Sequence, residues 1–177
     1  MAEVFVNSQT RAAGIVTTST GGAIGVTTTI ITGISTAGVA VGYMIDNQHF
    51  RGGAKVSALG SSQVTVDKTS TNTASAASQT VKFMGPTTCY TSPSSTKSIL
   101  IGGTYANLTN NSVNMFVELK SGSTHTGIAN DIPVPTGSSF VISDAGKTVM
   151  AGDDEVRIYV DTDSAIDVTM GILQGVN

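Results

Sequence analysis

The sequence has no tryptophan, one cysteine and few aromatic or charged residues, which make up 5% and 12% of its 177 positions. The single cysteine, Cys89, excludes an internal disulfide bond, so stability has to come from packing or from neighbouring molecules. Low charge combined with 40% hydrophobic residues is unlike a disordered chain. Cys89 lies at the start of an expected strand, and we interpret it as a buried structural thiol.

Small hydroxyl residues are abundant: 26 threonines and 20 serines occupy more than a quarter of the chain, beside 20 glycines. Thr, Val and Ile fit half-buried pleated strands, whereas Gly, Ser and Asn serve turns. No stretch has the period of a long amphipathic helix. The composition therefore predicts an all-β fold, and the length allows two small β domains.

Acidic residues outnumber basic ones by 12 to 9, which gives a net charge of −3 and a pI near 5.1. This balance argues against a nucleic-acid partner, because nucleic-acid-binding domains present a basic face. Residues 1–86 carry five basic and three acidic residues, and residues 87–177 carry four and nine. The asymmetry indicates either two solvated surfaces or an aid to head-to-tail association.

No membrane or secretory segment is expected. Residues 12–45 are uncharged, but Gly and Thr interrupt them too often for a membrane span. The first residues have neither the basic nor the apolar region of a secretory signal.

The first half of the chain is expected to form an extended arm over residues 1–11 and an N-terminal β module over residues 12–86. Strands are predicted at 14–18, 24–32, 39–45, 55–59, 63–67 and 79–83, with a turn at 46–53 and a loop at 68–78. Alternation along these strands predicts a core of Val39, Val41, Val64, Val66, Val81 and Phe83.

Residues 87–97 are interpreted as a linker, because Gly85-Pro86 and the Ser/Thr-rich stretch around Pro93 break the chain in close succession. Seven short strands follow at regular spacing, at 98–108, 113–120, 127–132, 139–142, 148–150, 155–161 and 165–173. They predict a seven-stranded β-sandwich over residues 98–177. Its expected core contains Ile99, Ile101, Phe116, Val141, Val156, Ile158, Val168 and Ile172.

Few residues are candidates for catalysis or for binding a ligand. His49 and His125 are the only imidazoles, and without a Gly-x-Ser-x-Gly motif both are interpreted as surface histidines. The triplet Gly146-Lys147-Thr148 is not a phosphate-binding loop, because Val141 occupies the place of the earlier glycine. The acidic run Asp153-Asp154-Glu155 is interpreted as a solvated turn.

Asp161, Asp163 and Asp167 are spaced like the opening of a calcium-binding loop. An EF-hand is excluded, because Ile166 and Ile172 stand where that loop needs Gly and Glu. A looser calcium site in a β-turn remains an alternative to an exposed connection. No catalytic, cofactor-binding or metal-binding residue is assigned, and the protein is not expected to be an enzyme.

The first resemblance to a known family lies in the N-terminal half. A strand, a Gly-rich bend, a short hairpin and a final strand follow one another in Gly42-Tyr43-Met44-Ile45-Asp46, Gly52-Gly53-Ala54-Lys55, Val64-Thr65-Val66-Asp67 and Val81-Lys82-Phe83. This order resembles a β module that recurs in structural proteins of tailed bacteriophages.

The second resemblance extends from Thr88 to Leu173. It rests on Gly103-Thr104-Tyr105-Ala106-Asn107, Ile132-Pro133-Val134-Pro135-Thr136-Gly137, Gly146-Lys147-Thr148-Val149-Met150 and Asp167-Val168-Thr169-Met170. These stretches resemble a β-sandwich in virion structural proteins of marine and cyanobacterial phages. The two resemblances together cover about three quarters of the chain.

The resemblance implies a non-enzymatic component of the virion, without catalytic residues or cofactors. Its expected role is a capsid decoration or cement protein, and a neck, tail or fibre component is the alternative within this class. A host-surface carbohydrate-binding module is an alternative of another class, which the lack of tryptophan disfavours. A hydrolase that uses His49 or His125 is the weakest alternative.

The expected partners are copies of the chain itself and other virion proteins, without nucleic acid or membrane. Scarce charge leaves sheet edges poorly protected, which favours a homo-oligomer or attachment to a larger shell. Val4, Phe5 and Val6 of the arm are expected in the contact. A disordered tail is the alternative for this arm.

Overall fold

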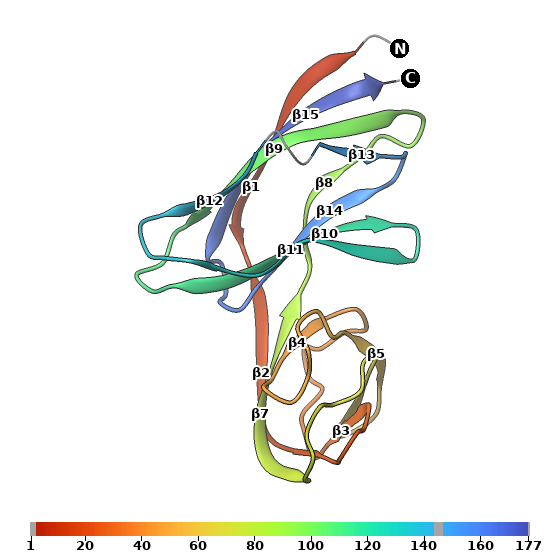
Figure 1. Cartoon of the computed structure of the whole chain (residues 1–177), viewed down its shortest axis with the longest axis vertical. Coiled ribbons are helices and arrows are strands. Elements are labelled where there is room, and N and C mark those ends of the chain that lie inside the picture. Colours follow the sequence, from red (N-terminus) through yellow and green to blue (C-terminus); the bar gives the residue numbers. More distant parts are fainter. Residues whose placement is uncertain (1–2, 144–146, 177) are drawn as a thin grey trace. The chain divides into compact units, whose positions relative to one another are not determined.

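The computed structural model describes residues 3–143 and 147–176, and within these ranges the chain forms fifteen strands and no helix (Figure 1). The predicted all-β class is therefore confirmed. The strands belong to two compact units. One unit contains the chain up to Gly14 and from Thr87 onward, and the other contains Ile15–Pro86. The second unit is thus inserted into the sequence of the first.

The first unit is a sandwich of two antiparallel sheets. Its strands are β1 (Val4–Ala13), β8 (Thr87–Thr91), β9 (Lys97–Asn107), β10 (Val113–Ser121), β11 (Thr124–Val134), β12 (Ser139–Ile142), β13 (Thr148–Met150), β14 (Glu155–Val160) and β15 (Ile166–Val176). One sheet, which we call the terminal sheet, has the order β1-β15-β9, with β12 and β13 both paired to the far side of β9. The other sheet has the order β11-β10-β14-β8.

This strand order is that of a jelly roll. If β12 and β13 count as one interrupted strand, the unit has eight strands in the spatial orders 1-8-3-6 and 2-7-4-5. Two four-stranded sheets in these orders form the two Greek keys of a jelly roll. The insertion lies between the first and second strands.

The observed division of the chain differs from the predicted one. The arm expected over residues 1–11 is strand β1, whose residues Val4 to Thr10 pair in register with Gln174 to Val168 of β15. The linker expected over residues 87–97 contains β8, which pairs with β14. Alternation in β1 was hard to recognise, because polar Ser8 and Thr10 occupy its half-buried positions. Two strands therefore join the seven predicted ones.

The sandwich core confirms four predicted residues, Val156, Ile158, Val168 and Ile172. Leu100, Tyr105, Met115, Met150 and Met170 fill much of the remaining core. Phe116 is buried as expected, although it is not part of this cluster. Val141 is 55% exposed, so its predicted place in the core is wrong.

Ile99 and Ile101 were also placed on the wrong face, and a β-bulge is the reason. In the β9–β15 ladder Leu100 faces Ile172 and Gly102 faces Gly171, so Ile101 is an extra residue on β9. The bulge shifts the inward positions from even to odd numbers along the strand. Because a shift of one residue exchanges the two faces, simple alternation fails here.

The second unit is a small closed barrel. Its strands are β2 (Ile15–Ile24), β3 (Ile30–Thr32), β4 (Met44–Asp46), β5 (Val56–Leu59), β6 (Gln63–Val66) and β7 (Ala76–Gly85), in the order β4-β7-β2-β3-β6-β5. The ring closes because Ile45 N donates to Ala54 O and Val56 N donates to Tyr43 O, each at 2.8 Å. Closure removes the free edges of a sheet.

The barrel core contains Val39, Val64, Val66, Val81 and Phe83, as predicted. Val41 is 62% exposed, so its predicted place is wrong. Gly38 and Gly42 adopt φ angles of +74° and +89°, which turn the chain on both sides of Val41 and end the alternation. The predicted strand over 39–45 shortens to β4, and the one over 24–32 separates into the end of β2 and β3.

We predict that the sandwich folds without the barrel but not without β1 and β8. Gly14 N lies 3.4 Å from Thr87 Oγ1, so a short glycine linker can replace Ile15–Pro86. This variant should show a β-rich circular dichroism spectrum and cooperative thermal unfolding, whereas residues 98–177 alone should stay unfolded. A cooperative transition of residues 98–177 alone would contradict this.

Candidate functional site

The two histidines are on different units and have different surroundings. His49, in the barrel unit, places Nε2 3.4 Å from Gln48 Nε2. His125, at the start of β11, places Nδ1 3.0 Å from Oε1 of Glu118, a buried carboxylate. Tyr159 donates its hydroxyl to the same Oε1 at 2.7 Å. Burial, followed by the contact with Glu118, raises the pKa of Tyr159, so it acts as a hydrogen-bond donor.

Cys89 is buried, as predicted. Burial raises the pKa of its thiol to about 12, although a hydrogen bond with Thr10 acts in the opposite direction. The thiol lies 3.6 Å from Thr87 O and is protonated at neutral pH. Because the thiolate is the nucleophilic form, Cys89 is unreactive in this setting.

Three aspartates of the acidic runs accept hydrogen bonds from main-chain amides of the sandwich. Asp161 Oδ1 accepts from Asn114 N at 3.1 Å, and Asp167 Oδ1 accepts from Ala12 N at 2.8 Å. Asp154 Oδ2 accepts from Ala151 N at 2.8 Å. Over residues 3–143 and 147–176, no three His, Cys, Asp or Glu side chains are grouped to hold a metal ion. Gly146 of the Gly-Lys-Thr triplet lies outside the described residues.

Glu155 is the centre of an ion-pair network on the sheet that contains β10 and β14. Lys120 Nζ lies 2.6 Å from Oε1, while Arg157 Nη2 lies 2.8 Å and Thr88 Oγ1 3.1 Å from Oε2. Partial burial would raise the pKa of Glu155, but these hydrogen bonds and the charge of Arg157 lower it to about 2. The network therefore joins three strands, β8, β10 and β14, around one carboxylate.

We predict that Glu155→Gln lowers the free energy of unfolding at pH 7 by about 1–2 kcal/mol, a typical value for hydrogen bonds to a charged group. Because the folded pKa lies below the ordinary value of 4.5, the carboxylate stabilises the fold fully above that value. The difference between the parent chain and the variant should shrink as the pH falls from 5 to 2. Urea unfolding at several pH values measures it.

Asp153→Asn is the matched control, because it removes an exposed carboxylate from the same unit. Its effect should stay below about 0.5 kcal/mol at every pH. An equal loss in both variants, or a pH-independent loss in Glu155→Gln, would contradict the assignment.

Exposed apolar side chains cross the outer face of the terminal sheet. In register, Phe5 of β1 pairs with Leu173 of β15, Leu173 with Ile99 of β9, and Ile99 with Val149 of β13. Paired residues of antiparallel strands lie on the same face, so these four side chains form one row across four strands. We call them the apolar row.

The apolar row points away from the sandwich core. Each member has a sequence neighbour in or against the core: Val6, Ile172, Leu100 and Met150. Phe5 is 76% exposed and Val149 is 60% exposed, whereas Leu173 and Ile99 are partly buried between them. Contiguous exposed apolar side chains mark interaction surfaces more often than isolated ones do.

Sequence reasoning missed this row, although it named Phe5 as a contact residue. Its four members come from four distant segments, and only the ladder register brings them together. The prediction that Ile99 lies in the core also excluded this residue from any surface row. The remaining signal in the sequence is the apolar run Val4-Phe5-Val6 in the segment expected to be an arm.

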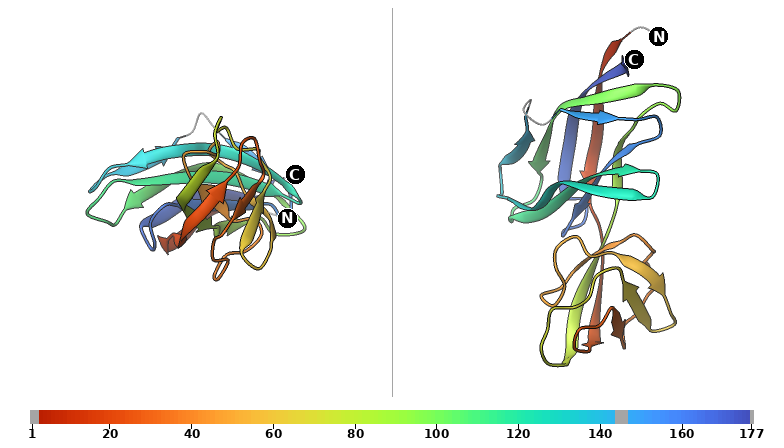
Figure 2. Two further views of the ribbon diagram at one scale, coloured as in Figure 1. Left: turned by 90° about the horizontal axis from the view of Figure 1, so that it is seen from below. Right: turned by 45° about the vertical axis from the view of Figure 1, so that its right-hand side comes forward.

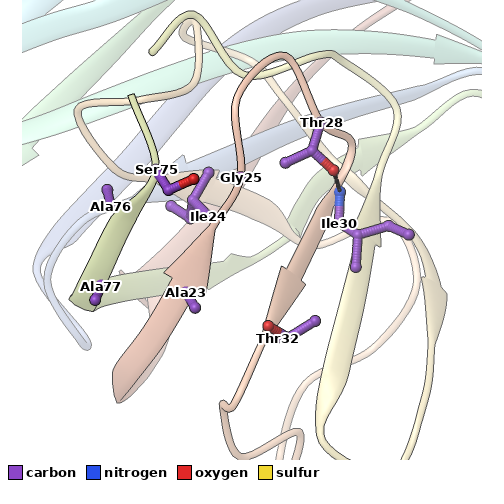
Figure 3. A pocket seen from close by; sticks show the side chains of 9 residues that line it. All are labelled: Ala23, Ile24, Gly25, Thr28, Ile30, Thr32, Ser75, Ala76 and Ala77. Carbon is purple, nitrogen blue, oxygen red and sulfur yellow. Dashed lines mark hydrogen bonds between the residues drawn. The ribbon is translucent and has the colours of Figure 1, made fainter. Parts of the chain in front are cut away.

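The barrel has a surface pocket lined by the end of β2, by β3 and by the start of β7 (Figure 3). The side chains that line it are small or apolar, apart from the hydroxyls of Thr28, Thr32 and Ser75. Thr28 Oγ1 accepts a hydrogen bond from Ile30 N at 3.1 Å. No charged or imidazole side chain lines this pocket, so it offers no general acid or base.

No protein-family model, curated protein or solved structure gives a significant match to this chain. Within the part of the chain that the structure describes, no helix is long and apolar enough to cross a membrane. The candidate functional site is the apolar row and the sheet face around it, because apolar side chains of four strands adjoin there on the surface.

Proposed function

We propose that the protein is a non-enzymatic structural subunit of a tailed-phage virion, with capsid decoration or cementing as its role. Its partners are copies of itself and other virion proteins. The observation that carries the proposal is a jelly roll with an exposed apolar row across one sheet. Jelly rolls recur in viral capsid proteins and also in lectins, so the fold supports the proposal by analogy.

A particle subunit binds through a surface and needs no reactive centre. In this chain the conspicuous surface feature is the apolar row. Asp161 and Glu155, by contrast, bind a main-chain amide and a lysine within the sandwich. The inserted barrel has its own core, so it supplies a second body that can contact a neighbour. Both properties suit a protein displayed in many copies on a lattice.

The carbohydrate-binding alternative has less support. Sugar sites commonly use exposed aromatic rings, yet Tyr90, Tyr105 and Tyr159 are buried. Tyr43 is partly buried and packs against the barrel core. The neck, tail or fibre alternative uses the same kind of surface and differs in its place on the particle.

We predict that purified particles of the phage that encodes this chain contain it in many copies that follow the icosahedral lattice. Electron cryomicroscopy of particles with the parent chain, and quantification of its copy number by mass spectrometry, measure this. Phe5→Ser should reduce the copy number at least about threefold if the apolar row holds the subunit, whereas Leu108→Ser should not, because Leu108 is an exposed residue just after the other end of β9.

A ring of copies at a single vertex would overturn the decoration role in favour of a neck or tail component. Absence from the particle, together with binding on a glycan array, would overturn the proposal in favour of the carbohydrate-binding alternative.

A further inference from the structure

The apolar row is shaped to pack against a second copy of itself. Across the sheet its side chains decrease in size, from Phe5 on β1 through Leu173 and Ile99 to Val149 on β13. A two-fold axis parallel to the strands reverses this order in the partner. It places the largest side chain opposite the smallest and Leu173 opposite Ile99, so the combined bulk is nearly constant along the row.

We propose that the terminal sheet packs face to face on the terminal sheet of a second copy about such an axis. This names the partner of the surface on which the proposed function rests. Sheets pack face to face at about 10 Å with their strands nearly aligned, and the inner side chains interdigitate. An isologous contact of this kind closes as a dimer.

Charge on the same face favours this axis over the other possible one. Glu3 directly precedes β1, two residues before Phe5, and Lys97 is the first residue of β9, two residues before Ile99. In an extended chain residues two apart lie on the same side, which places both charges on the side of the row. Both residues are exposed. The axis parallel to the strands brings Glu3 toward Lys97 of the second copy, whereas an axis across the strands through the row places Phe5 opposite Phe5 and carries Lys97 of the second copy to the other side of the row, away from Glu3. Complementary charges fix the register of an interface, so the ion pair between Glu3 and Lys97 favours the axis parallel to the strands.

Paired cysteine variants test the geometry directly. Phe5 and Val149 of one chain are separated by three inter-strand steps, about 14 Å, which a disulfide within one chain cannot span. Packed sheets can be bridged by a disulfide, as in immunoglobulin domains. The native Cys89 does not interfere, because it is buried and protonated.

Phe5→Cys and Val149→Cys chains are prepared separately, mixed in equal amounts and oxidised with copper phenanthroline in air. The mixture is expected to give a disulfide-linked dimer of one chain of each kind, and neither variant alone should link efficiently. Linkage of Phe5→Cys to itself would overturn the proposed axis. Absence of the mixed dimer would overturn it as well.

Sedimentation velocity of the full chain tests the contact without an engineered bond. We expect a dimer whose Kd rises at least about tenfold in Phe5→Ser and remains unchanged in Leu108→Ser. Glu3→Lys and Lys97→Glu should each weaken the dimer, and the double variant should restore it. A monomeric parent chain, or a dimer insensitive to Phe5→Ser, would overturn the inference.

The two proposals fail in distinguishable ways. A dimer with the expected disulfide in a protein that is absent from the particle overturns the virion function and leaves the self-association standing. A monomer that nevertheless occupies the capsid lattice overturns the self-association and leaves the virion function standing.

Discussion

The ladder between the first and last strands is the interaction on which the sandwich depends. Val4 to Thr10 of β1 pair with Gln174 to Val168 of β15, and Ala13 pairs with Ile166 after a bulge. Figure 2 shows these strands side by side, in red and blue. Without β1, the main-chain groups at the edge of β15 would be unpaired, and the core side chains against which Val6 packs would be exposed. The same strand brings Phe5 to the outer face.

The insertion is compatible with this ladder because the barrel closes on itself. Ile15 of β2 pairs with Gly85 of β7, so the two chain segments that enter and leave the barrel are adjacent. The end of the first sandwich strand and the start of the second therefore lie close together, at Gly14 and Thr87. A closed barrel has its own core, so its stability depends little on packing against the rest of the chain.

Much of the fold could be predicted from the sequence, and the misses have physical causes. Strands from β9 to β15 were recognised because turn residues separate alternating segments. Strand β1 was missed because Ser8 and Thr10 give no hydrophobic alternation, and Ile99 was misplaced because a bulge follows it. The apolar row could not be predicted, since strand register is a tertiary property. Local sequence does not reveal which distant residues share a row.

Hydrogen–deuterium exchange of the full chain measures the central ladder most directly, because exchange protection reports the stability of individual main-chain hydrogen bonds. We predict that the ladder amides of Val6 to Thr10 exchange as slowly as those of Val168 to Ile172 on β15. Exchange of the β1 amides at the rate of an unstructured chain, with β15 still protected, would contradict it.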